Sequence, residues 1–367
     1  MIPVALQSSS NRVDDSGRWC RPTTLFEPGI VVDGDTGEHR HLLSPEAGSA
    51  TPNSAAETDI FRSQLLTGAY GPTTDDEGVS AIHTYLDAGG TLIDTGDFYG
   101  AGHNEMLIGR ALKGRSRDEV VLSVKFGAVL SPDGSFIGFD SRPDTVRSSL
   151  AYTLRRLGTD HVDIYRPARL DPNVPIEETV GTIAELAEAG YVRSIGLSEV
   201  GAETLRRAAQ VAPISDLQIE YSLLTRSIES NGILAACRDL GIGVTAYGAL
   251  AKGLLAGKTD GTRAMFPRFQ GDNLTHNERI VSALGAVASA KGITLPQLAI
   301  AWVEAQGEDI VPVVGSRTSE QVSATLSSAE VELSPTDLTA VAEVLDGSEV
   351  QGDRYPEALM AQLDSER

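Results

Sequence analysis

The chain has 367 residues, enough for one large α/β barrel domain with extra segments or for two medium domains. Its formal net charge of −21 and pI near 4.6 argue against nucleic acid or an anionic membrane as a partner, because both would repel the surface. With Cys20 and Cys237 as the only cysteines, neither a disulfide framework nor a thiolate metal site is supported, and a reducing compartment is favoured. Because the N-terminus lacks a secretory signal pattern and no run of 18 apolar residues occurs, we expect a cytoplasmic protein.

The first part of the chain shows little periodicity. Residues 1–58 are rich in Ser, Thr, Pro, Gly and acidic side chains, which predicts a flexible extension. A weak first strand is expected near 64–68. The next segment has a candidate N-cap at Thr74, acidic residues in its first turn and a Gly pair at 89–90, so it predicts a helix of about three to four turns.

From residue 91 onward, strand patterns and helix patterns alternate. The predicted strands are short and rich in Val, Ile and Leu, as is typical of strands buried on both faces, and they occupy 91–95, 120–126, 162–168, 192–198, 216–222, 243–248 and 310–315. The predicted helices between them include 144–158, 176–190, 201–212, 230–241 and 277–292.

With the weak strand near 64–68, these alternating units predict an α/β fold of the (β/α)8 TIM barrel class, whose chemistry lies at the carboxyl ends of the strands. A doubly wound open sheet is the alternative, but no Gly-x-Gly-x-x-Gly follows a strand. The expected division is an extension over 1–58, the barrel over 59–345 and a C-terminal tail over 346–367.

Three polar residues follow two neighbouring predicted strands. Asp94 and Tyr99 close the first apolar run, and Lys125 closes the second. Because parallel strands end on one rim of a barrel, we expect these side chains to converge. A nearby ammonium lowers the pKa of a phenol by favouring phenolate, and a carboxylate holds the ammonium in place. Such a tyrosine can protonate a carbonyl oxygen, although each residue taken alone is more often a turn cap, a packing residue or a solvated charge.

A series of motifs then follows in order: LIDTGDFYG, GHNEMLIGRAL, VKFG, VRSIGLSEV, LQIEYSL, AYGALAKGLLAG, PRFQGDN and VPVVGSR. From about residue 64 to about residue 340, the chain resembles the aldo-keto reductases, most closely the bacterial branch with a pyridoxal-reductase-like middle section. The resemblance implies a (β/α)8 barrel that binds NADPH without a Rossmann domain and reduces aldehydes and ketones.

The resemblance also implies roles for individual residues. Tyr99 becomes the general acid, Lys125 the group that lowers its pKa and Asp94 the partner of Lys125. The expected nucleotide contacts are Ser198 and Gln218 to the carboxamide, Tyr247 stacked on the nicotinamide, and a set on the phosphates and adenosine: Gly248, Leu250, Lys252, Gly315, Ser316, Arg317 and Gln321. Small-residue loops and a bidentate arginine suit phosphate oxygens. A helix N-cap, a strand-end polar contact and barrel packing are the alternative readings of Ser198, Gln218 and Tyr247.

The chain first departs from the family pattern at Ala168, where the aldo-keto reductases that it resembles usually have the His of a Tyr-x-x-His segment. An alanine side chain donates no hydrogen bond, and losing one preorganised donor typically costs about 10²–10³ in rate. Arg166, Arg169 or His103 could substitute for the imidazole. Alternatively, the smaller side chain enlarges the pocket for a bulkier substrate, or activity is lost.

Two further departures concern the nucleotide. Glu199 stands where the family usually has Asn, so its side chain can accept from the carboxamide N–H₂ but cannot donate. Gln321, Ala324 and Thr325 stand where the family often has Arg, Glu and Asn, which leaves NADH open beside NADPH. Specificity is expected in the loops 128–141, 223–231 and 257–277, whose Phe136, Phe139, Phe266 and Phe269 line the pocket or pack.

The leading hypothesis is therefore an NADPH-dependent oxidoreductase that reduces the carbonyl group of a small or aromatic aldehyde or ketone, with Tyr99 as the general acid. Its partner would be a small-molecule carbonyl substrate, with no nucleic acid, no membrane and no metal, and the oligomeric state is left open. One alternative, motivated by Ala168, is a nucleotide-binding protein with little catalysis. Another is an alkene reductase on the same fold, because replacing the His can let a substrate sit differently over the nicotinamide.

Overall fold

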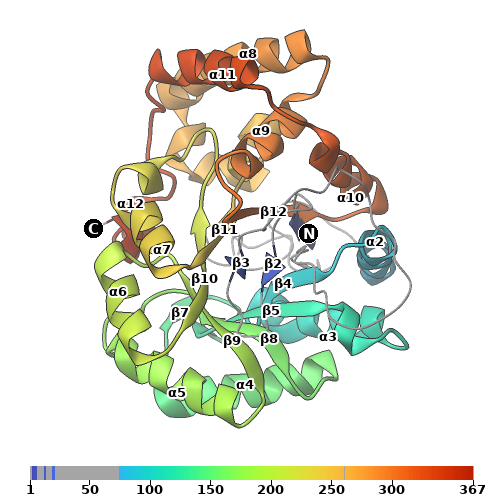
Figure 1. Cartoon of the computed structure of the whole chain (residues 1–367), viewed down its shortest axis with the longest axis vertical. Coiled ribbons are helices and arrows are strands. Elements are labelled where there is room, and N and C mark those ends of the chain that lie inside the picture. Colours follow the sequence, from blue (N-terminus) through green and yellow to red (C-terminus); the bar gives the residue numbers. More distant parts are fainter. Residues whose placement is uncertain (1, 6–11, 14–18, 21–73, 260, 367) are drawn as a thin grey trace.

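The computed structural model describes residues 2–5, 12–13, 19–20, 74–259 and 261–366. At its centre, parallel strands form a curled sheet that is surrounded by helices (Figure 1). Along the sheet their order is β12-β11-β10-β9-β8-β5-β4, so strands that follow one another in the chain are also neighbours in space. The bounds of these strands are β4 (Leu92–Gly96), β5 (Val121–Phe126), β8 (Val162–Pro167), β9 (Val192–Ser198), β10 (Ile214–Glu220), β11 (Gly243–Tyr247) and β12 (Ile310–Ser316).

The strands predicted between residues 91 and 315 all form, with ends that differ from the prediction by no more than two residues. The helices are α2 (Asp75–Asp87), α3 (His103–Leu112), α4 (Pro143–Leu157), α5 (Ile176–Glu188), α6 (Ala202–Val211), α7 (Ile233–Leu240), α8 (Gly271–Lys291), α9 (Leu295–Glu304), α10 (Ser319–Leu326), α11 (Pro335–Asp346) and α12 (Glu357–Met360). This alternation of strand and helix confirms the predicted α/β fold of the (β/α)8 TIM barrel class. The predicted N-cap is also confirmed, because Thr74 forms a capping box with Glu77 at the start of α2.

Short strands near the N-terminus were not anticipated. The backbone of β1 (Ile2–Ala5) pairs antiparallel with β12 and also contacts β4. β2 (Arg12–Val13) and β3 (Trp19–Cys20) pair with each other. The strand expected near 64–68 lies outside the described residues, as does most of the expected extension, so the division of the chain at 58 and 345 stays a prediction.

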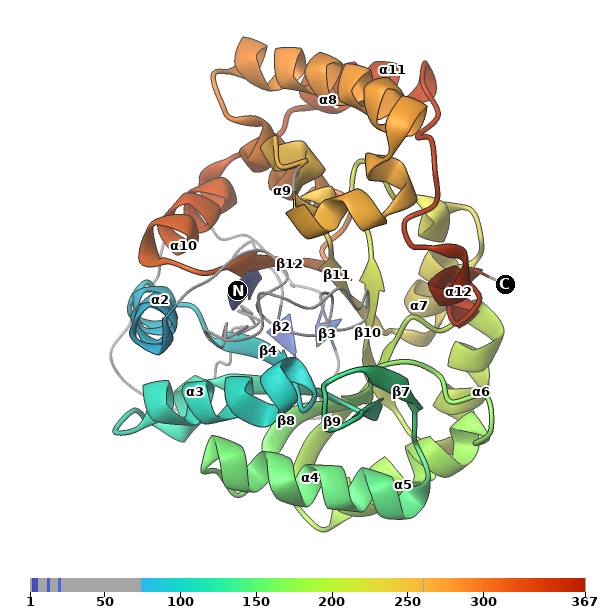
Figure 2. The same cartoon turned by 180° about the vertical axis from the view of Figure 1, so that it is seen from behind.

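Two helices extend the ring at one end of the molecule. α8 and α11 pack against each other beyond the ring of helices, as both views show (Figures 1 and 2). Within the described part of the chain, no single helix is long and apolar enough to cross a membrane. α8 and α9 reach that threshold only as a pair, and the pair is bent by 88° at its break.

The apolar core lies mainly between the sheet and the surrounding helices, where residues such as Ile93, Val124 and Tyr165 are fully buried. A separate, small apolar cluster is formed by Leu92, Val121 and Ile164, which lie side by side on the neighbouring strands β4, β5 and β8. Further along the same strands, toward their carboxyl ends, the buried residues become polar and charged. The candidate site begins at this change from apolar to polar residues.

The rim at the carboxyl ends of the strands carries further short elements. β6 (Ala128–Leu130) and β7 (Phe136–Phe139) form a hairpin within the loop 128–141 that was expected to carry specificity. After β11 come three 3-10 segments, η5 (Ala251–Ala256), η6 (Gly261–Met265) and η7 (Pro267–Phe269).

Candidate active site

The three residues expected to converge do lie together. Asp94 on β4 and Lys125 on β5 form a buried ion pair through Asp94 Oδ2, and Ser123 Oγ donates to Asp94 Oδ1 at 2.6 Å. The Lys125 ammonium lies 5.2 Å from the centroid of the half-buried Tyr99 ring. Strand register explains the meeting, since Asp94 pairs with Ser123 and Gly96 pairs with Lys125 across adjacent strands. Carboxylate, ammonium and phenol therefore form one contiguous group.

A second charged pair lies beside the first, inside the barrel. The Arg166 side chain is fully buried, with Nη1 at 3.0 Å from Asp216 Oδ2, and its Nη2 donates to Ser123 Oγ at 2.6 Å. We call Asp94, Lys125, Arg166 and Asp216 the barrel cluster. Barrel interiors are usually filled by branched apolar side chains, so two acids and two bases at this level are a departure from the common pattern.

The surroundings of Asp216 show how the barrel cluster fits its space. Thr245 Oγ1 donates to Asp216 Oδ2 at 2.7 Å. Burial raises the pKa of Asp216, while Arg166 opposes the shift. On β9, Gly196 leaves room for both side chains, because a Cβ at this position would lie 3.1 Å from Arg166 Nε and still closer to the Asp216 carboxylate. A glycine here is therefore explained by the close approach of two charged side chains.

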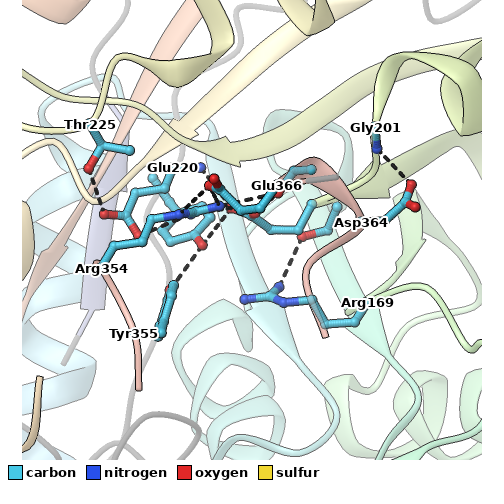
Figure 3. A network of polar contacts seen from close by, with 12 residues as sticks. Arg169, Gly201, Glu220, Thr225, Arg354, Tyr355, Asp364 and Glu366 are labelled. Atoms are coloured by element: carbon cyan, nitrogen blue, oxygen red, sulfur yellow. Dashed lines mark hydrogen bonds and ion pairs between the residues drawn. The ribbon is translucent and has the colours of Figure 1, made fainter. Parts of the chain in front are cut away.

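Another group of charges lies at the mouth of the barrel. Arg354, from the segment after α11, donates to both carboxylate oxygens of Glu199 at 3.0 and 2.7 Å and to Glu220 at 3.2 Å (Figure 3). Lys252 Nζ donates to Glu220 Oε2 at 2.9 Å. We call Glu199, Glu220, Lys252 and Arg354 the rim cluster. It ties the C-terminal segment to the ends of β9 and β10.

The rim cluster sets the charge of its acids. Burial alone would raise the pKa of Glu199, but Arg354 and other cationic and hydroxyl partners bring it well below its usual range. For Glu220, Lys252 and Arg354 outweigh burial and lower the pKa to about 2. Burial lowers the pKa of Lys252, and Glu220 counteracts that shift. Both acids are therefore ionised at neutral pH.

Glu199 is saturated with protein donors. Besides Arg354, its carboxylate accepts from the Tyr247 hydroxyl at 2.7 Å, from the Glu220 N–H at 3.0 Å and from the Ser365 hydroxyl. The Tyr247 hydroxyl also lies 3.0 Å from the hydroxyl of Tyr355. The interpretation that Glu199 accepts from a nicotinamide carboxamide is not supported, because both oxygens already hold protein partners.

The residues expected at the carboxamide lie side by side. Ser198 and Gln218 are paired in register on β9 and β10, and both side chains are buried. Within the described residues, Gln218 Nε2 is a buried donor with no hydrogen-bond partner. A buried amide without a partner is costly unless a ligand satisfies it, so this position fits an amide-bearing ligand.

The residues expected at the phosphates fall into two groups. Gly248, Leu250 and Lys252 follow β11, and the Lys252 ammonium is held by Glu220 and lies 4.1 Å from the centroid of the Tyr355 ring. The second group lies at the end of β12 and the start of α10, and consists of Gly315, Ser316, Arg317 and Gln321.

At the end of β12, the Arg317 N–H donates to Gln321 Oε1 at 2.8 Å, which fixes the turn into α10. Burial, followed by the charge of Arg263, lowers the pKa of Arg317. A guanidinium at the turn into a helix is suited to bind a phosphate group.

Backbone strain is concentrated on the same rim. In the described part of the chain, the non-glycine residues with a left-handed backbone are Ala101, Glu199, Ala251 and Lys252. Ala101 lies two residues after Tyr99, Glu199 follows Ser198, and Ala251 and Lys252 lie in the loop after β11. Such conformations cost of order 1–3 kcal/mol each and are typical of functional loops.

Of the three residues considered as substitutes for the missing imidazole, only Arg169 lies beside the residues expected at the nicotinamide. Ala168 is buried at the end of β8, and its N–H donates to the Phe126 carbonyl at 2.8 Å. Arg166 is committed to the barrel cluster, and His103 Nε2 contacts Asp75 Oδ1 at 2.9 Å at the start of α2. Arg169 Nη1 instead lies 3.4 Å from Ser198 Oγ, beside the residues expected at the nicotinamide.

A pocket of about 620 Å³ lies between the β6–β7 hairpin, the loop after β8 and the C-terminal segment. Phe136 and Phe139 line it, whereas Phe266 and Phe269 are buried in the core. Among the described residues, no group of three or more His, Cys, Asp or Glu side chains could hold a metal ion.

The contribution of the C-terminal segment was not predicted. The sequence placed Arg354, Tyr355 and Ser365 in a tail, and no spacing signal joins them to Glu199, which lies 155 residues before Arg354. The left-handed backbone of Glu199 could not be read from the sequence either. Only the unusual acid in the GLSEV segment pointed to this position.

Comparison with known proteins identifies the family. A model of the Aldo/keto reductase family matches residues 63–346. The chain is 40% identical over 298 residues to probable aldo-keto reductase 1 of Glycine max, with 79% of this chain and 86% of that protein covered. It is also similar to the solved structure of a glycerol dehydrogenase from Gluconobacter oxydans, with a TM-score of 0.71, 30% identity, and 79% of this chain and 92% of that chain covered.

A second solved structure, a thermostable aldo-keto reductase in complex with the inhibitor epalrestat, has a TM-score of 0.63 and 28% identity, with 76% and 93% of the two chains covered. The family model spans most of the chain, and the relatives are matched over most of their length. With its barrel and its Asp94–Lys125–Tyr99 group, this chain belongs to the aldo/keto reductase family, a family of oxidoreductases.

Proposed function

We propose that this protein is an NADPH-dependent reductase of small or aromatic aldehydes and ketones, with Tyr99 as the general acid. The observation that supports this most directly is the contact between the Tyr99 ring and the Lys125 ammonium, whose own position is fixed by Asp94. Relatives named as an aldo-keto reductase and as a glycerol dehydrogenase agree with carbonyl and alcohol chemistry.

The proposed roles follow from the contacts of each residue. The nucleotide, when bound, supplies a hydride to the carbonyl carbon. Tyr99 donates its phenolic proton to the carbonyl oxygen, which yields the alcohol. Lys125 stabilises the phenolate that remains, and Asp94 holds the ammonium while Ser123 occupies the other carboxylate oxygen. Ala168 provides no second side-chain donor to the carbonyl oxygen.

The proposed nucleotide contacts are those expected from the sequence. Ser198 and Gln218 would hold the carboxamide, which the unpartnered Gln218 Nε2 supports, and Tyr247 would carry the nicotinamide ring. The phosphate contacts would come from the loop after β11 and the turn after β12: Gly248, Leu250, Lys252, Gly315, Ser316, Arg317 and Gln321.

The proposal favours NADPH over NADH. Arg317 lies in the turn between β12 and α10, where its guanidinium can pair bidentately with an additional phosphate. The proposal also includes a small-molecule carbonyl partner and a cytoplasmic location, the latter supported by a composition with two cysteines.

Turnover of NADPH with a panel of aldehydes and ketones, followed by loss of its absorbance, tests the reaction. Tyr99→Phe should lower kcat by about 10²–10⁴-fold, because general acid catalysis contributes that much. Quenching of protein fluorescence by NADPH should be unchanged, since the phenol is not assigned to the nucleotide. If Tyr99→Phe retains full turnover, the assignment of the acid is wrong.

Ala168 favours one second candidate, a nucleotide-binding protein with little catalysis. That function predicts strong fluorescence quenching by NADPH without turnover of any carbonyl compound. Absence of quenching at saturating nucleotide would rule out both candidates.

A further inference from the structure

Arg169 occupies a distinctive place at the mouth of the barrel. It follows Ala168 directly, so it enters the site from the position at which the family usually supplies an imidazole. The side chain is half-buried, and Nη1 donates to the Ala168 carbonyl at 2.6 Å and lies 3.4 Å from Ser198 Oγ. Figure 3 shows Arg169 and Tyr355 reaching the same region from different segments of the chain.

Three other cations at this end of the barrel each hold an acid. Lys125 holds Asp94, Lys252 holds Glu220, and Arg354 holds Glu199. Arg169 forms no ion pair with any residue that the structure describes, and only its Nη1 has hydrogen-bond partners there. A guanidinium carries five N–H donors in a planar fork, so Nε and Nη2 remain available to a ligand.

The charge of Arg169 is maintained by its surroundings. Burial would lower the pKa of Arg169, but the nearby Tyr247 and Glu199 outweigh burial and raise it. Glu199 cannot itself serve as the partner, because Arg354, Ser365 and Tyr247 occupy its oxygens. A permanently charged, partly satisfied guanidinium beside the proposed nicotinamide contacts is best matched by a carboxylate, whose two oxygens fit the fork.

We propose that Arg169 binds a carboxylate of the substrate and makes the enzyme selective for aldehydes and ketones that carry one. This inference rests on the proposed function and adds the class of substrate to it. The carboxylate is unchanged in the reaction: the carbonyl carbon gains a hydride, the carbonyl oxygen gains the Tyr99 proton, and the product is a hydroxy acid. In a protein with a net charge of −21, a local unneutralised cation is also what an anionic substrate requires.

Matched pairs of substrates test the inference. 4-Carboxybenzaldehyde is compared with its methyl ester, and 4-oxobutanoate with its methyl ester, by measuring kcat and KM at saturating NADPH. The wild-type protein should prefer at least one carboxylate member over its ester by about tenfold to a hundredfold in kcat/KM, the range for a charge-assisted hydrogen bond. Arg169→Met should remove this preference, mainly through KM, while the ester is turned over within about threefold of the wild-type rate.

Three controls make the result specific. Arg169→Lys keeps the charge without the fork and should retain part of the preference. Arg206→Met removes an exposed arginine that pairs with Asp239 on the outer helices and should leave the preference intact. Thermal unfolding of each variant, together with the Kd for NADPH from fluorescence quenching, checks that the fold and the nucleotide site are unchanged.

Several outcomes would overturn the inference. Equal kcat/KM for acid and ester in the wild-type protein would show that the guanidinium does not recognise a carboxylate. An equal loss on both members in Arg169→Met would indicate that it acts on the carbonyl oxygen instead. A tenfold rise in the Kd for NADPH in that variant would assign Arg169 to the nucleotide. If no carbonyl compound, charged or neutral, is reduced by the wild-type protein, the proposed function itself fails and the inference fails with it.

Discussion

The barrel cluster and the rim cluster both contain two acids and two bases, but they are built in different ways. The barrel cluster takes every member from a strand or a strand end, namely Asp94, Lys125, Arg166 and Asp216. The rim cluster depends on Arg354, which comes from the C-terminal segment and reaches back to Glu199. One is assembled by sheet register, and the other forms only when two distant parts of the chain meet.

This difference separates two tasks at the same end of the barrel. The barrel cluster meets the proposed proton donor through Lys125, whose partner Asp94 is connected to Arg166 by Ser123. The rim cluster instead fixes the residues near the proposed nicotinamide, because the Tyr247 hydroxyl donates to Glu199. The barrel cluster is thus positioned by the strands, and the rim cluster fastens the C-terminal segment to the ends of β9 and β10.

Removing Arg354 should have the largest effect of the changes considered. Arg354→Met leaves the buried Glu199 without its main counter-charge and removes one of the two cationic partners of Glu220. Breaking a buried ion pair in this way typically costs about 3–5 kcal/mol. The free energy of unfolding, measured in urea at neutral pH, should fall by that amount. A loss of that size would show that the ion pairs of Arg354 contribute to the stability of the fold.

Arg206→Met serves as the matched control, because Arg206 forms an exposed ion pair with Asp239. Surface pairs contribute about 0–1 kcal/mol, so this variant should unfold close to the wild-type midpoint. Equal losses in Arg354→Met and Arg206→Met would contradict the central role given to the buried pair.

The two clusters also differ in how far the sequence predicted them. Asp94, Lys125 and Tyr99 could be grouped because each follows an apolar run, and parallel strands bring such residues to one rim. Arg166 was considered only as a replacement donor, because an arginine inside a barrel conflicts with the usual apolar filling. Its partner Asp216 gave no signal, since an acid at the start of a predicted strand usually lies in solvent.

Glu199 and Lys252 were both singled out in the sequence, but their meeting with Arg354 in one cluster could not be predicted. Local patterns report what a residue does within a strand or helix, whereas the meeting of Arg354 with Glu199 depends on the path of the chain after α11. The barrel strands expected between residues 91 and 315 formed, but the pairing of β1 with β12 also required a contact between residues 2–5 and 313–316. Contacts between residues far apart in the sequence leave no periodic signal, so neither the pairing of β1 with β12 nor the contact of Arg354 with Glu199 was predicted.

An intermediate effect is expected at Gly196, which packs against the barrel cluster. Gly196→Ala would place a methyl group 3.1 Å from Arg166 Nε and closer to Asp216, so one of the two side chains must move. Overpacking of this kind costs about 1–3 kcal/mol, which urea unfolding would measure. kcat should fall as well, because Arg166 contacts Ser123, which in turn holds Asp94.

Gly285→Ala is the matched control for that change. A Cβ at Gly285, within α8, meets no atom within 4 Å, and alanine is favoured over glycine inside a helix by about 0.5–1 kcal/mol. This variant should therefore be slightly more stable than the wild-type protein, with kcat unchanged. Were Gly196→Ala to match it in stability, the barrel cluster would have more free space than its contacts indicate.

The smallest expected effect concerns pH, and here the clusters should respond with opposite signs. Glu220 has its pKa lowered in the folded protein to about 2, so the stability it contributes is present above the unfolded-state pKa of about 4.3 and is lost as the pH falls toward 2. The stability difference between wild type and Glu220→Gln should thus shrink by roughly 1 kcal/mol between pH 6 and pH 3.5. Burial raises the pKa of Asp216, so its protonated form is favoured in the folded state. Acidification should therefore increase the stability of the wild-type protein relative to that of Asp216→Asn. Urea unfolding at both pH values measures the two differences, and slopes of equal sign would mean that the two clusters do not impose different electrostatic environments.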